Sequence, residues 1–253
     1  MNFKIFDHKM RVFETSSDHC VPQGSYMVAR LDGRGFTKLT NRMDKPFSTV
    51  FNIRMCDTVK HLMGCGFNIL YAYTQSDEIS LLFHPSENSF NRKTRKFISI
   101  LAGEASAVFT LSFGHPAVFD CRISALPDVG TAVDYFRWRQ SDCLRNALNS
   151  MCYHALRNDG QSSRQATKTL KGVPVKEKKQ LYTDITGDCF REEKSWKRLG
   201  IGFSWKKVKS TGYNPISEQH VDTYSNRIIE DPFLPEGEEY SEYIAKLLEG
   251  EDK

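Results

Sequence analysis

Residues 67–83, FNILYAYTQSDEISLLF, contain two apolar runs on either side of a short polar and acidic stretch. The runs 67–73 and 79–83 have the length and composition of strands, and the residues between them are few enough to close a hairpin. Asp77 and Glu78 then lie at the tip of the hairpin or just past it. The rest of the chain predicts a sheet built around this hairpin.

A second acidic turn lies earlier in the chain, in residues 27–36, MVARLDGRGF. Asp32 directly follows an apolar run, 25–31, that reads as a strand. Gly33 and Gly35 let the backbone approach a ligand closely, and Arg34 suits a phosphate. Folding can therefore bring two carboxylates to one edge of a sheet. The simpler alternative is that Asp-Gly and Ser-Asp only form turns.

The order of the other elements predicts an α+β fold. Apolar spacing indicates helices over 47–63 and 91–112, and proline residues bound a further strand at 117–126. The order is then β-α-β-β-α-β, the ferredoxin-like arrangement, with an antiparallel sheet and two helices on one face. Polymerase palms also use this arrangement, although a fold alone does not assign a function.

The second half of the chain predicts mainly helices. Helical patterns cover 131–157, 162–170 and 175–181, a last strand is expected at 201–208, and the acidic residues from 215 onward predict a surface-draped tail with a helix at 240–248. We expect three parts: a palm-like catalytic domain at 1–130, a helical and strand extension packed on it at 131–210, and an acidic tail at 211–253.

Charge is distributed unevenly along the 253 residues, although the net charge is only +4. The segment 164–179 carries six basic residues and one acid, which suits a polyanion such as a nucleic acid; a solvated helix face is the alternative. No apolar run approaches the ~20 residues of a membrane helix, and no secretory signal is found at the start, so a cytoplasmic location is expected. Seven scattered cysteines read as reduced thiols.

The paired carboxylates predict a site for a hard cation. Oxygen ligands select Mg²⁺ or Mn²⁺, and Mg²⁺ is usually held by one or two protein carboxylates, with waters and substrate phosphates completing its shell. Asp32 and Asp77 could bracket two ions about 3.5–4 Å apart, with the Gly33 carbonyl as a further ligand. Glu78 reads as a surface acid or as an outer partner of the site.

A nucleotide at this site would need further positive charge. Lys45 lies on a loop that could reach the site. Further candidates share the predicted start of the second palm helix, where free N–H groups add positive potential; they are Arg92, Lys93, Arg95 and Lys96. The chain contains no P-loop motif, no complete Gly-x-Gly-x-x-Gly after a strand, and no Gly-x-Ser-x-Gly elbow.

Five blocks in colinear order resemble the tRNA-histidine guanylyltransferase family. They are LDGRGF at 31–36, KP at 45–46, QSDE at 75–78, FDCR at 119–122 and DYFRWRQSDC at 134–143. The similarity continues through 170–172 to 200–202. It therefore spans roughly residues 5 to 208.

The resemblance implies an enzyme that adds nucleotides to the 5′ end of tRNA, in the 3′-to-5′ direction. It implies a palm, two Mg²⁺ ions on Asp32, Gly33 and Asp77, and a homotetramer. ATP or GTP would activate a 5′-monophosphate, which the 3′-hydroxyl of an incoming nucleoside triphosphate would attack. The residues expected at the nucleotide are Gly33, Arg34, Gly35, Phe36, Lys45, Ser76, Arg92, Lys93, Arg95, Lys96 and Arg122.

A second group of residues is expected to contact tRNA. These residues lie on the predicted helix 131–157 and on the basic segment; they are Arg137, Arg139, Arg145, Asn146, Lys168, Lys171, Lys176, Lys178 and Lys179. The three arginines could instead pair with Asp134 and Asp142 on the same helix. Tyr135, Trp138 and Leu148 fall close to one helix face and are expected in the core or a subunit interface.

Two departures from the family pattern point to a subgroup. Eukaryotic members acting on histidine tRNA carry His-Ile-Asn-Asn where LRNA stands at 144–147, so only Asn146 survives. The family's His that follows the Gly-Arg-x-Phe block is replaced by Thr37. The pattern resembles the Thg1-like subgroup of bacteria and archaea, which repairs 5′-truncated tRNA by template-directed addition. The alternatives are a guanylyltransferase dedicated to histidine tRNA, a palm-type cyclase or conventional polymerase, and a non-catalytic tRNA-binding protein.

Overall fold

The computed structural model describes residues 3–214 and 219–250. In these residues six strands form one antiparallel sheet in the order β4-β1-β3-β2-β5-β6. Their bounds are Tyr26–Gly33 (β1), Ile69–Gln75 (β2), Glu78–Phe83 (β3), Phe119–Leu126 (β4), Ile201–Asn214 (β5) and Gln219–Asp231 (β6). The expected hairpin is β2–β3.

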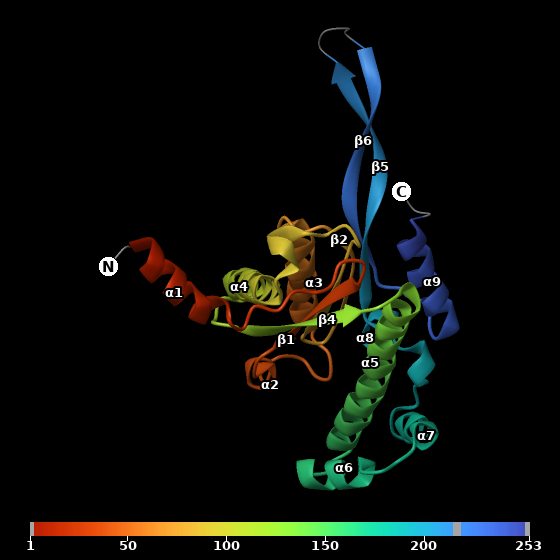
Figure 1. Ribbon diagram of the computed structural model, residues 1–253. Coiled ribbons are helices and arrows are strands. Elements are labelled where there is room, and N and C mark those ends of the chain that lie inside the picture. Colours follow the sequence, from red (N-terminus) through yellow and green to blue (C-terminus); the bar gives the residue numbers. More distant parts are fainter. Residues whose placement is uncertain (1–2, 215–218, 251–253) are drawn as a thin grey trace.

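Two helices cover one face of the sheet, as the sequence predicted. α3 (Thr49–Gly64) lies over β2 and α4 (Thr94–Phe113) over β4 and β1, and they share a core in which Met55, Leu101 and Leu31 are buried. Alternate residues of β1 point to opposite faces, so Val28 belongs to the core on the other side. The β-α-β-β-α-β order is therefore confirmed (Figure 1).

The other face of the sheet is covered by α5 (Val129–Asn158) and α9 (Glu238–Glu249). Phe136 of α5 and Tyr240 of α9 are fully buried against Tyr71, and the hydroxyl oxygens of Tyr71 and Tyr240 lie 3.1 Å apart. The predicted helix at 240–248 is confirmed, but the expectation of a surface-draped tail is wrong for α9.

The second half of α5 extends away from the sheet and carries the smaller helices (Figure 1). α6 (Ser163–Leu170) and α7 (Val175–Thr186) pack on it through a separate core that includes Leu156, Leu170 and Tyr182. The 3₁₀ turn η2 (Phe190–Glu192) and α8 (Ser195–Leu199) lead back to the sheet. The basic segment thus lies on a helical lobe away from the palm.

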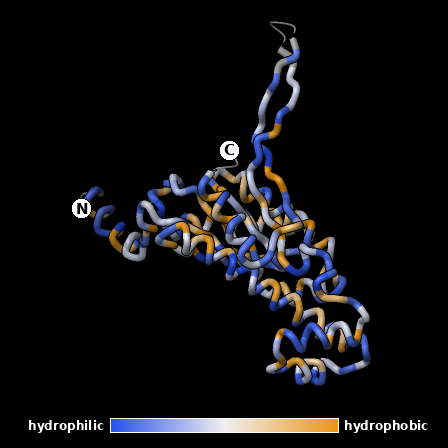
Figure 2. Tube along the Cα trace, turned by 90° about the vertical axis from the view of Figure 1, so that its right-hand side faces the viewer, coloured by the Kyte–Doolittle hydropathy of each residue, from blue (hydrophilic) through white to orange (hydrophobic). Residues whose placement is uncertain are grey.

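Strands β5 and β6 continue beyond the sheet as a two-stranded ribbon (Figure 1). The strand predicted at 201–208 is therefore longer than expected, and the polar stretch that follows contains a second strand instead of a draped tail. Figure 2 shows the outer ribbon as mostly hydrophilic, and runs of consecutive exposed residues, such as 205–207 and 222–227, place solvent on both of its faces. The expected boundary at residue 211 falls inside β5, and the division into three parts stays a proposal.

Two helices depart from the expectations in other ways. α1 (Phe3–Thr15) was not predicted, and none of its residues is buried. α4 is long and apolar enough to cross a membrane by length and composition, contrary to the expectation that no run approached this length. Its Phe97 and Phe109, however, are fully buried in the core under the sheet, as in a core helix of a globular protein.

Candidate active site at the acidic edge of the sheet

The two acidic segments meet at one end of the β1–β3 pair. The N–H of Gly33 donates to the carbonyl oxygen of Asp77 at 3.0 Å, and Asp32 stands opposite Glu78 in the strand register. Strand β1 ends here, and the turn between β2 and β3 carries Ser76 and Asp77. The structure thus brings Asp32, Gly33 and Asp77 together as expected; their role as metal ligands stays a prediction.

Gly33 is required at this edge by the packing of Phe36. A Cβ atom on Gly33 would lie 2.5–2.8 Å from the Phe36 ring, well inside contact distance. Phe36 opens the short helix α2 (Phe36–Leu39), is buried, and packs against Phe51, Phe109 and Phe119. Gly35 precedes it with φ 73°, a conformation that glycine adopts without strain. The two glycines therefore let the chain turn tightly after Asp32.

The carboxylates at this edge differ in their surroundings. Burial raises the pKa of Asp77, the nearby charge of Asp32 adds to this, and a hydrogen bond from Ser76 Oγ at 3.0 Å opposes it. Burial also raises the pKa of Glu78, although Arg139 opposes the shift with two hydrogen bonds of 2.7 and 2.8 Å. Within residues 3–214 and 219–250, no ion pair forms to Asp32 or Asp77.

This donor set fits magnesium. The Asp32 carboxylate is near enough to raise the pKa of Asp77, neither acid pairs with a cation in the described part of the chain, and a backbone carbonyl adjoins them at Gly33. The described part of the chain holds no cluster of three or more His, Cys, Asp or Glu side chains that could bind a metal. A site with so few protein ligands suits an ion that keeps waters and substrate phosphates in its shell.

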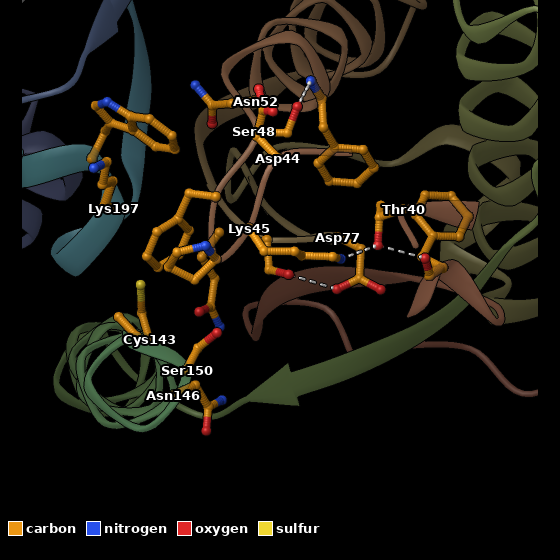
Figure 3. A pocket seen from close by; sticks show the side chains of 18 of the residues that line it. Thr40, Asp44, Lys45, Ser48, Asn52, Asp77, Cys143, Asn146, Ser150 and Lys197 are labelled. Atoms are coloured by element: carbon orange, nitrogen blue, oxygen red, sulfur yellow. Dashed lines mark hydrogen bonds between the residues drawn. The ribbon is translucent and has the colours of Figure 1, made fainter. Parts of the chain in front are cut away.

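A pocket of about 300 Å³ opens beside Asp77. Figure 3 shows Lys45, Thr40 and Asp77 on one side of the pocket and Cys143, Asn146 and Ser150 of α5 on another. Further lining residues come from loops and helices far apart in the chain; they include Phe36, Phe47, Ser48, Asn52, Ser76, His154, Trp196 and Lys197.

The N-terminus of α3 gives one wall of this pocket a positive electrostatic potential. Ser48 caps the helix by accepting from the N–H of Phe51 at 3.3 Å, and both residues line the pocket. The Lys45 ammonium donates to Thr40 Oγ1 at 3.1 Å beside them. A helix N-terminus with an adjacent lysine is a favourable place for a phosphate group.

The predicted triphosphate cluster lies elsewhere. Arg92 is buried and donates to the carbonyl oxygen of Ser25 at 2.7 Å, just before β1 begins, whereas Asp32 lies near the end of that strand. Eight strand residues span about 25 Å. The placement of this cluster at the acidic edge was therefore wrong, because α4 begins at the opposite end of the sheet.

The other members of this cluster already have partners. Lys93 and Arg95 pair with Asp18, the former at 2.8 Å, and Lys96 lies 5.6 Å from the centre of the Phe90 ring. On β4, Arg122 is exposed and pairs with Asp120 at 3.3 Å. Of the predicted nucleotide residues, the structure places Phe36, Lys45 and Ser76 at the pocket, with Gly33, Arg34 and Gly35 leading into it.

The predicted tRNA contacts on α5 are divided among different surroundings. Arg139 is buried and bound by Glu78 and Asp142, so its expected contact with tRNA is wrong for this conformation. Arg145 also pairs with Asp142, as the alternative proposed, whereas Arg137 pairs with Glu238 of α9 at 2.6 Å. Asn146 lines the pocket beside Asp77.

The lysines of the basic segment lie on α6, α7 and the turn between them. Lys168, Lys171 and Lys176 are exposed, whereas Lys178 donates to Asn149 Oδ1 at 2.9 Å and Lys179 lies over the Phe190 ring. None of them is among the residues that line the pocket, although Asn149, the partner of Lys178, directly precedes the lining residue Ser150. Their role as tRNA contacts stays a prediction.

Several pocket residues were missed by reasoning from the sequence. Ser48 carried a usable signal, because serine before an apolar helical pattern is a preferred N-cap. His154 and Trp196 carried none, since they reach the pocket only through tertiary packing. Burial lowers the pKa of His154, with the charges of Lys45 and Arg157 adding to it, so this imidazole is neutral near neutral pH.

Comparison with known proteins gives a consistent result for both halves of the chain. Residues 7–127 match the family model described as tRNAHis guanylyltransferase, and residues 131–231 match the Thg1 C-terminal domain. A tRNA(His) guanylyltransferase of Debaryomyces hansenii is 30% identical over 185 residues, which cover 67% of this chain and 69% of that protein. A probable tRNA(His) guanylyltransferase of Mus musculus is 28% identical over 212 residues, 79% of this chain and 70% of the mouse protein.

Solved structures share the fold over nearly the whole chain. A bacterial tRNA(His) guanylyltransferase (Thg1)-like protein in complex with ATP aligns with a TM-score of 0.78 at 23% identity, covering 96% of this chain and 99% of that one. A second structure of such a protein, in complex with GTP, aligns with a TM-score of 0.70 at 21% identity, covering 96% and 98%. The palm-like α+β architecture is thereby confirmed.

Proposed function

Because the chain belongs to the tRNA-histidine guanylyltransferase family, a family of nucleotidyltransferases, we propose that it lengthens the 5′ end of tRNA in the 3′-to-5′ direction. The observation that carries this proposal is the meeting of Asp32, Gly33 and Asp77 beside a pocket that has its own phosphate-binding features. The reaction needs both a metal site and a nucleotide site, and these adjoin here.

The carboxylates of Asp32 and Asp77 and the Gly33 carbonyl would hold magnesium, in the two-ion arrangement that the family resemblance implies. When bound, the metal would lower the pKa of the attacking hydroxyl and would stabilise the charge that develops on the phosphoryl oxygens. The protein contributes position and electrostatics: the rigid strand pair fixes the spacing of the two carboxylates, and Ser76 orients Asp77.

The pocket would bind the nucleotide that activates the tRNA, ATP or GTP. Lys45 and the first turn of α3 lie where the phosphates of such a nucleotide could be held. Phe47 and Trp196, whose ring centres are 6.0 Å apart, offer aromatic surface for the base. The 5′ phosphate of the tRNA would attack the α-phosphorus of this nucleotide and release pyrophosphate. The 3′-hydroxyl of the incoming nucleoside triphosphate would then attack the activated 5′ phosphorus and release AMP or GMP, so the chain grows at its 5′ end.

Template-directed repair of 5′-truncated tRNA is the form of this activity that the sequence favours. Of the His-Ile-Asn-Asn residues of the histidine-specific members, only the Asn at 146 is kept, and it lines the pocket; Leu144, in place of the His, packs against the core of the helical lobe. The exposed lysines of α6 and α7 would position the tRNA by its phosphates. The homotetramer implied by the resemblance belongs to the same proposal.

The proposal is tested by incubating the protein with Mg²⁺, ATP and a tRNA lacking its first 5′ nucleotide, and by offering each nucleoside triphosphate in turn. We expect one residue to be added at the 5′ end, complementary to the opposing base of the acceptor strand, and the sequenced product identifies it. Addition at the 3′ end, or no extension with any triphosphate, would overturn the proposal. Addition of G regardless of the opposing base would indicate an enzyme dedicated to histidine tRNA.

A further inference from the structure

Arg139 is a buried arginine that joins the acidic edge to the wall of the pocket. Its side chain, on α5, is only 4% exposed. Nε donates to one oxygen of Glu78 at 2.7 Å and an Nη donates to the other at 2.8 Å, so the guanidinium occupies both oxygens of that carboxylate. The guanidinium carbon Cζ lies over the Trp138 ring, 4.4 Å from its centre.

The same guanidinium continues into a chain of polar contacts along α5. It donates to Asp142 Oδ2 at 3.0 Å, and the Asn146 amide donates to this same oxygen at 3.2 Å. Asn146 lines the pocket beside Asp77. An unbroken series of contacts therefore runs from Glu78, the residue after Asp77, to a residue on the opposite wall of the pocket.

Glu78 would be a natural third ligand if it were released. Asp32 and Glu78 are direct partners in the β1–β3 register, so their side chains lie on one face of the sheet with Cβ atoms about 4.5–5.5 Å apart. Among the residues that the structure describes, the second cation paired with Glu78 is Arg30, whose closest nitrogen is 3.7 Å away, beyond hydrogen-bond distance. Arg139 is therefore the group that fixes the direction of this carboxylate.

We propose that Arg139 is a positioning residue that keeps Glu78 out of the metal site, so that the site offers two carboxylates instead of three. This inference rests on the proposed function, since it requires a metal on Asp32 and Asp77. With two carboxylates the site suits Mg²⁺, which retains waters and accepts substrate phosphates. A third carboxylate would favour Ca²⁺, which takes six to eight oxygen ligands in flexible geometry.

The test measures metal binding directly, without relying on turnover. Mn²⁺ bound to the protein is followed by electron paramagnetic resonance and displaced by Ca²⁺ or by Mg²⁺, which gives the ratio of their affinities. Arg139→Gln should shift this ratio toward Ca²⁺ by about tenfold, the lower end of the roughly 10- to 100-fold effects that changes in the outer shell of a metal site have on metal affinity. Arg139→Lys, which keeps the charge but cannot bind both oxygens, should shift it in the same direction and provides the measurement if Arg139→Gln does not fold.

The double variant Arg139→Gln/Glu78→Gln separates positioning from a structural role. Without the Glu78 carboxylate the affinity ratio should return to within about twofold of the wild type. If Arg139 only stabilises the fold, affinity for both ions would fall together, the ratio would not change, and Glu78→Gln would restore nothing; this result would overturn the inference. Glu230→Gln is the matched control. It breaks the 2.8 Å ion pair between Glu230 and Lys60, which lies elsewhere in the protein, and should leave the affinity ratio unchanged.

Failure of the proposed function gives a different result from failure of this inference. If wild-type protein binds no Mn²⁺, or binds it equally well after Asp32→Ala and Asp77→Ala, the metal site itself is absent and both ideas fall. If binding depends on Asp32 and Asp77 but the ratio is insensitive to Arg139, only the role of Arg139 is wrong. Crystals of Arg139→Gln with Ca²⁺ should show a Glu78 oxygen on the ion.

Discussion

The backbone N–H of Gly33 donates to the backbone carbonyl of Asp77 at 3.0 Å, and this hydrogen bond extends the pairing of β1 with β3 to the turn that carries Asp77. It lies at the end of β1, where Asp32 already faces Glu78 across the register. Because the contact is between main-chain atoms, the spacing of the two acids is set by the sheet and not by flexible side chains. The chemistry expected at this edge depends on that geometry.

Asp77→Asn should stabilise the metal-free protein. Folding raises the pKa of this acid, so the folded state holds the proton more tightly than the unfolded chain, and stability falls as pH rises through the Asp77 pKa. The penalty is fully present at neutral pH, and the amide removes it. Calorimetry in EDTA should show a higher Tm for the variant than for the wild type. For a protein of this size, each roughly 1 kcal/mol of added unfolding free energy raises Tm by about 2–4 °C.

Magnesium should make the wild-type protein more stable than Asp77→Asn. Ligands that bind only the folded state raise its Tm, so wild-type protein should gain stability on addition of Mg²⁺ whereas Asp77→Asn gains little. The gain in wild type should shrink as pH falls toward the raised pKa of Asp77, since protons compete with the metal. An equal response of both proteins to Mg²⁺ would place the metal elsewhere.

Gly33→Ala should damage the acidic edge through packing. Its Cβ would overlap the Phe36 ring, so either Phe36 or the end of β1 must move, at a cost of about 1–3 kcal/mol in unfolding free energy. Chemical denaturation measures this cost. The matched control is Gly103→Ala on the exposed side of α4, where a Cβ meets nothing within 4 Å; there the helix should gain about 0.5–1 kcal/mol. Equal effects at both positions would contradict the packing argument.

Lys45→Ala should weaken binding of the activating nucleotide. The lysine lies at the pocket with the first turn of α3, and removal of a charged hydrogen bond to phosphate costs about 1.5–3 kcal/mol, or roughly 10- to 150-fold in Kd. Isothermal titration with ATP and Mg²⁺ provides the measurement. Lys246→Ala on α9 removes the same charge away from the pocket and should leave Kd unchanged. An unaffected Kd in Lys45→Ala would remove this residue from the site.

Replacing Lys168, Lys171 and Lys176 together by Ala should weaken tRNA binding. These lysines are the exposed ones of the basic segment, and removing one lysine from a phosphate lowers the slope of log Kd against log salt by about 0.7–0.9. Filter binding across a salt series should therefore show a slope smaller by about 2–3 for the triple variant. A slope equal to that of the wild type would place the tRNA on another surface.

The central fold was predictable because its signals are local. The apolar runs around Asp77 and the glycines after Asp32 fix strands and turns within a few residues, and their order defines the palm. The end of β5 and the whole of β6 were missed because solvent on both faces removes the alternation of apolar and polar residues by which a half-buried strand is recognised. The burial of Tyr240 depends on Tyr71, which no local pattern connects to it.

The candidate site was predictable where it depends on strand ends and was missed where it depends on helix placement. Asp32 lies at the end of β1 and Asp77 in the turn between β2 and β3, so the topology alone brought them together. Arg92 and its neighbours occupy a helix start that suits a phosphate, but the chain enters α4 from the opposite end of the sheet. The helix start that faces the pocket is that of α3, capped by Ser48.

The most direct test of the proposed reaction site is single-turnover extension of a 5′-truncated tRNA by Asp32→Ala and Asp77→Ala, with tRNA affinity measured on the same samples. Both variants should bind tRNA within a few-fold of the wild type and should lose at least about 10²–10³-fold in the rate of nucleotide addition, the loss typical of removing one preorganised electrostatic interaction. If either variant extends tRNA at close to the wild-type rate, the reaction does not take place between these two aspartates.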